Sequence, residues 1–269
     1  MLRLLRVIGG LTAMALVAAS VSARDLAAIR KDGTLRVLVV PLEREPEFVD
    51  LGSKTRPGFD IEILQGFART QKVALEIVTI DGWDQLIPAL LKERGDVIGG
   101  RFTDTEARRK QIQFTQSVFP TGVVVVTRKP RPAITTLDEL RAAERVGTVR
   151  GTSMDEAATA ALGPKAKIDY TALEQKDVSA ALRSGDITAA VWALEGAIAA
   201  ANRDPDLHIG LQLGPPAALA YGVRKEDAEL DAALDKHLEL LRKTGTWQKL
   251  VVRYLGASAP TILKGTGAP

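Results

Sequence analysis

Short apolar runs along the chain alternate with segments in which apolar residues recur at helical spacing. Runs typical of buried strands lie at 35–40, 75–80 and 96–98, whereas helical spacing dominates 61–68 and 86–91. Strands that alternate strictly with helices form parallel sheets covered by helices on both faces. The pattern therefore predicts an α/β fold.

A connector interrupts this series at 128–132, where two prolines remove backbone donors and force extended backbone. A second α/β series follows, with strands expected at 145–149, 187–192 and 207–213, and a Gly-Pro-Pro break at 214–216. Two breaks around a central block indicate that the chain leaves one lobe, builds a second and returns. A cleft between two lobes is a favoured place for a small-molecule site.

The domain organisation expected from these breaks has five parts. They are a signal peptide at 1–23, the first part of lobe 1 at 24–127, lobe 2 at 128–213, a return to lobe 1 with closing helices at 214–256, and a loose tail at 257–269. The signal peptide is predicted because Arg3 and Arg6 precede an apolar run at 7–19 and a small-residue cleavage site. Cleavage near Ala23 would release the mature chain into the periplasm.

The composition excludes several kinds of chemistry. The chain has no cysteine, which excludes disulfides, thiolate metal sites, a cysteine nucleophile and a lipid-modified N-terminus. The signal peptide carries two of the 36 basic residues. The remaining 34 are nearly balanced by 33 acidic residues, so the net charge of the mature chain does not indicate a nucleic-acid partner. No His, Asp or Glu cluster has the spacing of metal ligands, and neither a metal nor another cofactor is expected.

Five blocks stand out along the mature chain. They are Gly58-Phe59-Asp60-Ile61-Glu62-Ile63, Trp83 to Ile98, Thr103 to Thr115, Val146 to Ser153, and Gly245 to Gly256. In their order and spacing these blocks resemble the bacterial extracellular solute-binding proteins of family 3, the polar amino-acid-binding type that serves ABC importers.

The resemblance implies a two-lobed periplasmic binding protein fold of type II. Each lobe would be a mostly parallel sheet flanked by helices, and the chain would cross twice between lobes at a hinge. It also implies a monomeric receptor, not an enzyme, that closes on a small molecule and presents it to an ABC permease in the inner membrane. The charges of the site make an anionic, carboxylate-bearing solute the expected ligand, either an organic acid or an amino-acid-like molecule.

The resemblance places ligand-binding residues in both lobes. In lobe 1, Arg108 would hold a carboxylate through two charge-assisted hydrogen bonds, and Thr103 would add a donor. In lobe 2, Gly151, Thr152 and Ser153 would begin a helix whose backbone N–H groups and dipole favour an anion. The alternatives are a solvated Arg108 and ordinary helix capping by Ser153, and capping is compatible with anion binding.

Two tryptophans are candidates for the wall of the same cleft. Trp83 lies where the family usually has an aromatic residue against the ligand, and Trp192 ends an expected strand of lobe 2. Each could equally be a core residue, because a tryptophan at the edge of a strand or helix packs well in either role.

The chain departs from the family pattern where the family binds an α-ammonium group. Ala193 and Pro41 occupy the places of the acidic residues, and Glu195 is the nearest substitute, although a glutamate in a first helical turn has a common structural role. Arg101 replaces a glycine, and it would block the ordinary pocket, bind a second acidic group or point outward. The loss of acids and the gain of a cation predict a carboxylate or dicarboxylate that lacks an amine.

Two other functions fit the same sequence. One is a sensory or accessory periplasmic binding module without transport, which no sequence motif separates from an importer component. The other is a dehydratase on the same scaffold, with Glu195 as the acid and Arg108 as the anion clamp. His208 and His237 are interpreted as structural residues, which favours a binding protein over an enzyme.

Overall fold

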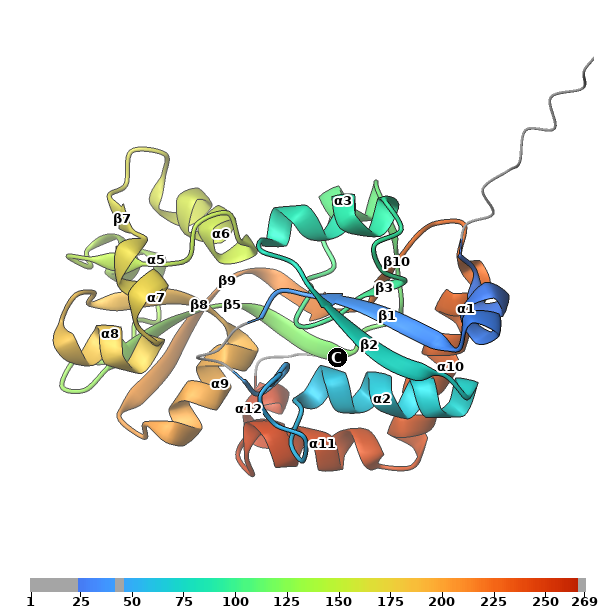
Figure 1. Cartoon of the computed structure of the whole chain (residues 1–269). Coiled ribbons are helices and arrows are strands. Elements are labelled where there is room, and N and C mark those ends of the chain that lie inside the picture. The colour runs from blue at the N-terminus through green and yellow to red at the C-terminus, as the bar shows by residue number, and fades with distance from the viewer. Residues whose placement is uncertain (1–23, 42–45, 266–269) are drawn as a thin grey trace, which may run out of the picture.

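The computed structural model describes residues 24–41 and 46–265, and it shows two α/β lobes side by side (Figure 1). The predicted signal peptide lies outside the described residues. Within the described ranges, no helix is both long enough and apolar enough to cross a membrane. The α/β fold class and the two-lobed arrangement predicted from the sequence are confirmed.

Lobe 1 is built on a five-stranded sheet with the order β2-β1-β3-β10-β4, in which β1, β2 and β3 are parallel and β10 is antiparallel to its neighbours. Val37 and Val39 of β1 pack on the side of α2, whereas Leu38 packs on the side of α3, so helices cover both faces. The elements are α1 (Leu26–Asp32), β1 (Thr34–Val39), α2 (Phe59–Gln71), β2 (Ala74–Thr79), the 3₁₀ helix η1 (Trp83–Gln85), α3 (Leu86–Leu91), β3 (Val97–Ile98), α4 (Glu106–Arg109), β4 (Gln113–Phe114) and β10 (Gly222–Val223).

Lobe 2 is built on a second five-stranded sheet with the order β7-β6-β8-β5-β9. Strands β6, β7 and β8 are parallel, and β5 is antiparallel to both β8 and β9. The elements are β5 (Phe119–Arg128), α5 (Leu137–Arg141), β6 (Val146–Gly147), α6 (Ser153–Leu162), β7 (Ile168–Asp169), α7 (Thr171–Gln175), α8 (Val178–Ser184), β8 (Ala189–Ala193), α9 (Leu194–Arg203) and β9 (Leu207–Leu219).

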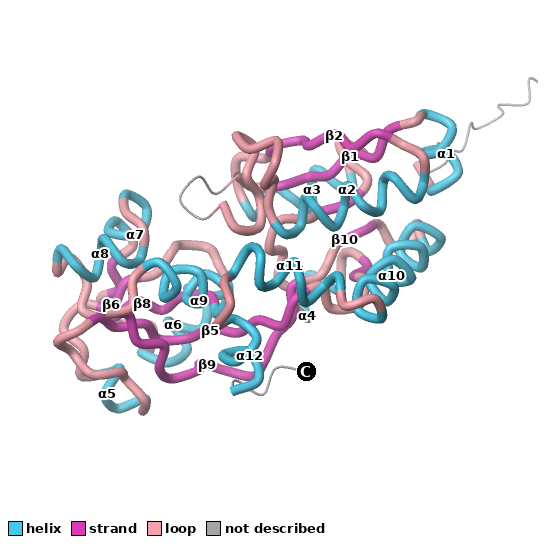
Figure 2. The backbone as a smooth tube through the Cα atoms, turned by 90° about the horizontal axis from the view of Figure 1, so that it is seen from below, coloured by secondary structure: helices cyan, strands magenta, loops and turns pink. Residues whose placement is uncertain are grey.

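The two connections between the lobes run side by side as β5 and β9 (Figure 2). These strands pair from Phe119 with Leu219 to Arg128 with Leu207, and the backbone of Val118 donates a 2.7 Å hydrogen bond to Leu219. The segment 119–127, which the expected boundaries assign to lobe 1, pairs here with strands of the lobe 2 sheet. The hinge is thus a two-stranded ribbon.

The break predicted at 214–216 is wrong, because β9 continues through it to Leu219. β9 is an edge strand of its sheet. An edge strand tolerates Pro215 and Pro216 because one side of its backbone needs no ladder donors, and the register shifts locally opposite Thr121 and Val123.

The C-terminal helices return to lobe 1 and then lie against α9 of lobe 2. They are α10 (Ala228–Lys243), α11 (Thr246–Leu255) and α12 (Ala259–Gly265). The loose tail predicted from 257 onward is wrong as far as α12 extends, since Ala259 and Leu263 are buried. Two apolar residues four positions apart are too weak a pattern to signal a helix, and contacts with α9 and α11 stabilise it.

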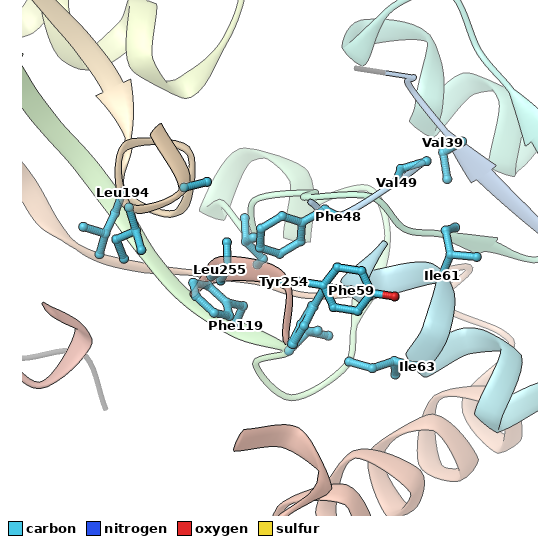
Figure 3. Packing of buried hydrophobic residues seen from close by; sticks show 14 of the residues in the cluster. Val39, Phe48, Val49, Phe59, Ile61, Ile63, Phe119, Leu194, Tyr254 and Leu255 are labelled. Atoms are coloured by element: carbon cyan, nitrogen blue, oxygen red, sulfur yellow. The ribbon is translucent and has the colours of Figure 1, made fainter. Parts of the chain in front are cut away.

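Buried aromatic residues pack where the lobes meet (Figure 3). The ring centroids of Phe48, Phe59 and Phe119 lie 5.3 to 5.7 Å apart, in tilted and edge-to-face arrangements that aromatic pairs prefer. Leu194, at the start of α9, belongs to the same cluster. The cluster therefore connects α2 of lobe 1 to the hinge strand β5 and to α9 of lobe 2.

Candidate functional site

A cavity of about 370 Å³ lies between the lobes and is lined by residues of both. Its lining consists of Pro41, Trp83, Arg101, Thr103, Arg108, Val149, Thr152, Ser153, Met154, Leu173, Glu174, Lys176, Asp177, Trp192, Ala193 and Glu195. Eight of the nine ligand-binding residues proposed from the sequence are in this set, and the ninth, Gly151, is not. We refer to this cavity as the cleft.

Arg108 is held in place on α4 of lobe 1. Thr105 caps this short helix by accepting a hydrogen bond from the backbone N–H of Arg108. The Arg108 guanidinium donates to the carbonyl of Thr103 at 2.7 Å and lies 4.1 Å from the ring centroid of Phe102. Burial lowers the pKa of Arg108, an effect opposed by the nearby Glu156 carboxylate.

Among the described residues, Arg108 forms no salt bridge. Lys176, another cation of the lining, is paired with Asp186, and Arg101 is paired with Glu195. Arg108 is therefore a fixed cation whose remaining N–H donors suit an anionic group in the cleft.

The start of α6 contributes backbone donors from lobe 2. The sequence alternative of capping by Ser153 is wrong, because Thr152 is the N-cap and its hydroxyl accepts from the backbone N–H of Asp155. The N–H of Gly151, in the left-handed region at φ 72°, already donates to the Asp155 carboxylate at 2.9 Å. The first-turn donors that remain for a ligand belong to Ser153 and Met154, which also line the cleft.

Both tryptophans contact the cleft and the hydrophobic core at once. Trp192 ends β8 and is 7% exposed, and it packs within the cluster that includes Leu194. Trp83 begins η1 and packs, half-buried, against the cluster that contains Leu86 and Phe102. Each tryptophan thus lines the cleft and also packs against the hydrophobic core.

Arg101 and Glu195 form a buried ion pair across the lobes. Arg101 Nε lies 3.1 Å from Glu195 Oε1, and the two side chains are 7% and 2% exposed. The other carboxylate oxygen of Glu195 accepts a hydrogen bond from the hydroxyl of Thr121. Arg101 thus does not point outward, one of the options left open by the sequence, and both Glu195 oxygens have a partner.

A buried carboxylate supports the loop that carries Arg101. Asp60 Oδ2 accepts a 2.8 Å hydrogen bond from the backbone N–H of Arg101, and Asp60 Oδ1 accepts one of 3.2 Å from the hydroxyl of Tyr221. Burial raises the pKa of Asp60 to about 6, although these hydrogen bonds and the Arg101 charge oppose the rise.

Sequence reasoning missed the lining contributed by the end of α7 and by its connection to α8. Glu174, Lys176 and Asp177 bring both signs of charge to the cleft. The only local signal was a run of charged residues, which usually marks a solvated loop. Gly196 was also missed, because its role depends on Arg101 and Trp192, which approach it closely. Groups of three or more metal-ligating side chains are absent from the described ranges.

Comparison with known proteins places this geometry in a family. The sequence model of one protein family, the bacterial extracellular solute-binding proteins of family 3, matches residues 35–257. The lysine/arginine/ornithine-binding periplasmic protein of Escherichia coli (strain K12) is 29% identical over 212 residues, which cover 73% of this chain and 78% of that protein.

Solved structures with the same fold include a variant of ArgBP from T. maritima, at 28% identity and a TM-score of 0.71, covering 85% of this chain and 98% of that one. A second is the ancestral amino acid-binding protein AncCDT-1, a precursor of cyclohexadienyl dehydratase. It has 27% identity and a TM-score of 0.73, covering 86% of this chain and 99% of that one.

Proposed function

The chain belongs to the bacterial extracellular solute-binding proteins of family 3, and we propose that it is a periplasmic receptor that delivers a small carboxylate-bearing solute to an ABC importer. The observation that carries the proposal is the position of Arg108. Its guanidinium lines the same cleft as the start of α6, so a carboxylate between them would contact both lobes.

Carboxylate binding follows from the donors that converge on the cleft. A guanidinium has five N–H donors, and the hydrogen bond to Thr103 uses one of them. Opposite charge and a helix N-terminus both favour an anion, and charge-assisted hydrogen bonds are about twice as strong as neutral ones. A ligand held by Arg108 and by the backbone of Ser153 would stabilise the closed arrangement of the lobes.

The bound solute lacks an α-ammonium group in this proposal. Ala193 and Pro41 line the cleft without offering a charge. Glu195 has both oxygens engaged, by Arg101 and by Thr121. An ammonium group beside them would be desolvated next to a carboxylate whose charge Arg101 already balances, which is unfavourable. An organic acid is therefore the ligand class that the charges support best.

A basic amino acid is the second candidate ligand. The relative from Escherichia coli is named for lysine, arginine and ornithine. In this chain Glu174 and Asp177 line the cleft on the lobe 2 side, and their carboxylates could accept a distal cation. This alternative requires the α-ammonium group to find another acceptor.

We propose binding without turnover. A dehydratase reaction of the kind considered from the sequence would need Glu195 to exchange a proton with the ligand. Its carboxylate is instead buried and shared between Arg101 and Thr121. The arrangement suits a fixed wall of the cleft.

Calorimetric titration of the mature chain tests the ligand class. Pyruvate, lactate, succinate and glutarate form one panel, and L-arginine, L-lysine, L-histidine and L-glutamate form the other. We expect at least one organic acid to bind about tenfold or more tightly than every amino acid, a difference of about 1.4 kcal/mol. Tighter binding of L-arginine or L-lysine would select the second candidate, and small-angle scattering would show whether the bound solute closes the lobes.

A further inference from the structure

The ion pair of Arg101 and Glu195 is part of the cleft wall. Arg101 follows β3 in lobe 1 and Glu195 lies in the first turn of α9 in lobe 2, 94 positions later. Each side chain lines the cleft, and each is almost completely buried. A charge removed from water this far needs its partner, because an unpaired buried charge is strongly destabilising.

The surroundings of the Arg101 guanidinium form a compartment shaped for that group. Its Cζ atom lies 5.7 Å from the ring centroid of Phe48, within the range of a cation–π contact. A Cβ atom at Gly196 would lie 3.1 Å from Arg101 Nη2, so the absence of a side chain there makes room for the guanidinium. A carboxylate, an aromatic ring and a bare backbone position thus enclose one planar cation.

The backbone at Arg101 is not adapted to an arginine. Its φ of 67° lies in the left-handed region, where a residue other than glycine is uncommon. The neighbouring Gly100 has a φ of 74°. A glycine at 101 would fit this loop without conformational strain, so the contacts of the Arg101 side chain must offset the strain.

We propose that Arg101 is a specificity-determining residue, whose guanidinium occupies a cation site built by Glu195, Phe48 and Gly196 and thereby excludes cationic groups of a ligand. The inference rests on the proposed function in placing the ligand in this cleft. It adds that the cleft contains a binding site for a guanidinium group, and that the side chain of Arg101 occupies this site. Removal of Arg101 would convert the cleft to one that binds cations.

Methylguanidinium is the probe for this test, because it carries the cation and no carboxylate and so does not depend on Arg108. We expect the Arg101→Gly variant to bind methylguanidinium at least about tenfold more tightly than the unmodified protein, measured by calorimetry. The variant should also gain thermal stability from methylguanidinium and not from tetramethylammonium at equal ionic strength. The double variant Arg101→Gly/Glu195→Gln is the matched control, and it should lose this gain.

The proposal would be overturned if Arg101→Gly and the double variant bound methylguanidinium equally well. It would also be overturned if the unmodified protein bound methylguanidinium as tightly as Arg101→Gly. If Arg101→Gly does not fold, Glu195→Gln decides. It leaves Arg101 without its counter-charge and should raise the affinity for succinate relative to propionate by about tenfold, whereas an unchanged ratio would contradict the inference. Failure of the organic acids to bind the unmodified protein would refute the proposed function and leave the methylguanidinium result standing.

Discussion

The carboxylate of Asp60 holds the backbone of Arg101 across a distance of 41 positions in sequence, through a hydrogen bond of 2.8 Å to its N–H. Asp60 lies in the first turn of α2, and Arg101 lies in the loop that leads to Thr103 and Arg108. The helix thus fixes the loop that carries Arg101 and leads through Thr103 to Arg108 on α4. We therefore expect the protonation state of this buried acid to affect the loop.

We expect Asp60 to make stability depend on pH between about 4 and 6. Burial raises its pKa from 3.8 to about 6, so in this window the folded protein binds more protons than the unfolded chain. The stability that this group contributes is therefore present at pH values below its pKa in the unfolded chain. It is lost as the pH rises through its pKa in the folded protein. Asp60→Asn removes this dependence on pH. The unfolding free energy of the variant, minus that of the unmodified protein, should therefore rise by on the order of 1 to 3 kcal/mol between pH 4 and pH 7.

Urea unfolding at several pH values measures this difference. The exposed Asp81→Asn serves as a control for the loss of a carboxylate. A gap between Asp60→Asn and the unmodified protein that stays constant with pH would show that Asp60 does not titrate in this window.

Arg108 should account for most of the affinity for a carboxylate. Arg108→Ala removes charge-assisted hydrogen bonds worth about 1.5–3 kcal/mol each, which corresponds to a loss of about tenfold to a hundredfold in affinity. Arg108→Lys should recover only part of it, because an ammonium cannot form the planar fork. The matched control is Arg109→Ala on the same helix, whose side chain is 66% exposed and paired with Asp104. Equal losses from both alanine variants by calorimetry would remove Arg108 from the binding site.

The alternation of strands and helices could be predicted from the sequence because each element satisfies its own hydrophobic period. The break predicted from the prolines at 215 and 216 was wrong, because a strand at the edge of a sheet accepts prolines that a central strand does not. The position of Arg101 was unusual in the sequence, but its pairing with Glu195 was not predictable. The two residues are 94 positions apart, and no local pattern encodes a contact between lobes.

Leu263 should contribute measurably to stability, contrary to the expectation of a loose tail. Its side chain is 7% exposed, and α12 packs on α9 and α11. Leu263→Ala leaves a cavity at this contact and should lower the unfolding free energy by about 2–3 kcal/mol. The exposed Thr261→Ala on the same helix is the control and should change stability little. Urea unfolding curves that coincide for Leu263→Ala and the unmodified protein would show that α12 does not stabilise the fold.

Gly196 should be intolerant of even a methyl group, although it lies inside α9, where alanine is ordinarily favoured by about 1 kcal/mol. A Cβ at this position would lie 2.6 Å from Trp192 Nε1 and 3.1 Å from Arg101 Nη2. The indole is buried and cannot move aside cheaply, so the steric conflict should outweigh the gain in helix propensity.

We therefore expect Gly196→Ala to lower both the thermal stability and the ligand affinity. Gly151→Ala is the informative comparison, because its Cβ would meet nothing within 4 Å and only the backbone at φ 72° opposes it. It should lose stability by about 1 kcal/mol and leave the cleft intact. In the Arg101→Gly background, Gly196→Ala should cost less, since one of the two conflicting side chains is gone. An equal cost in both backgrounds would show that Trp192 alone requires the glycine.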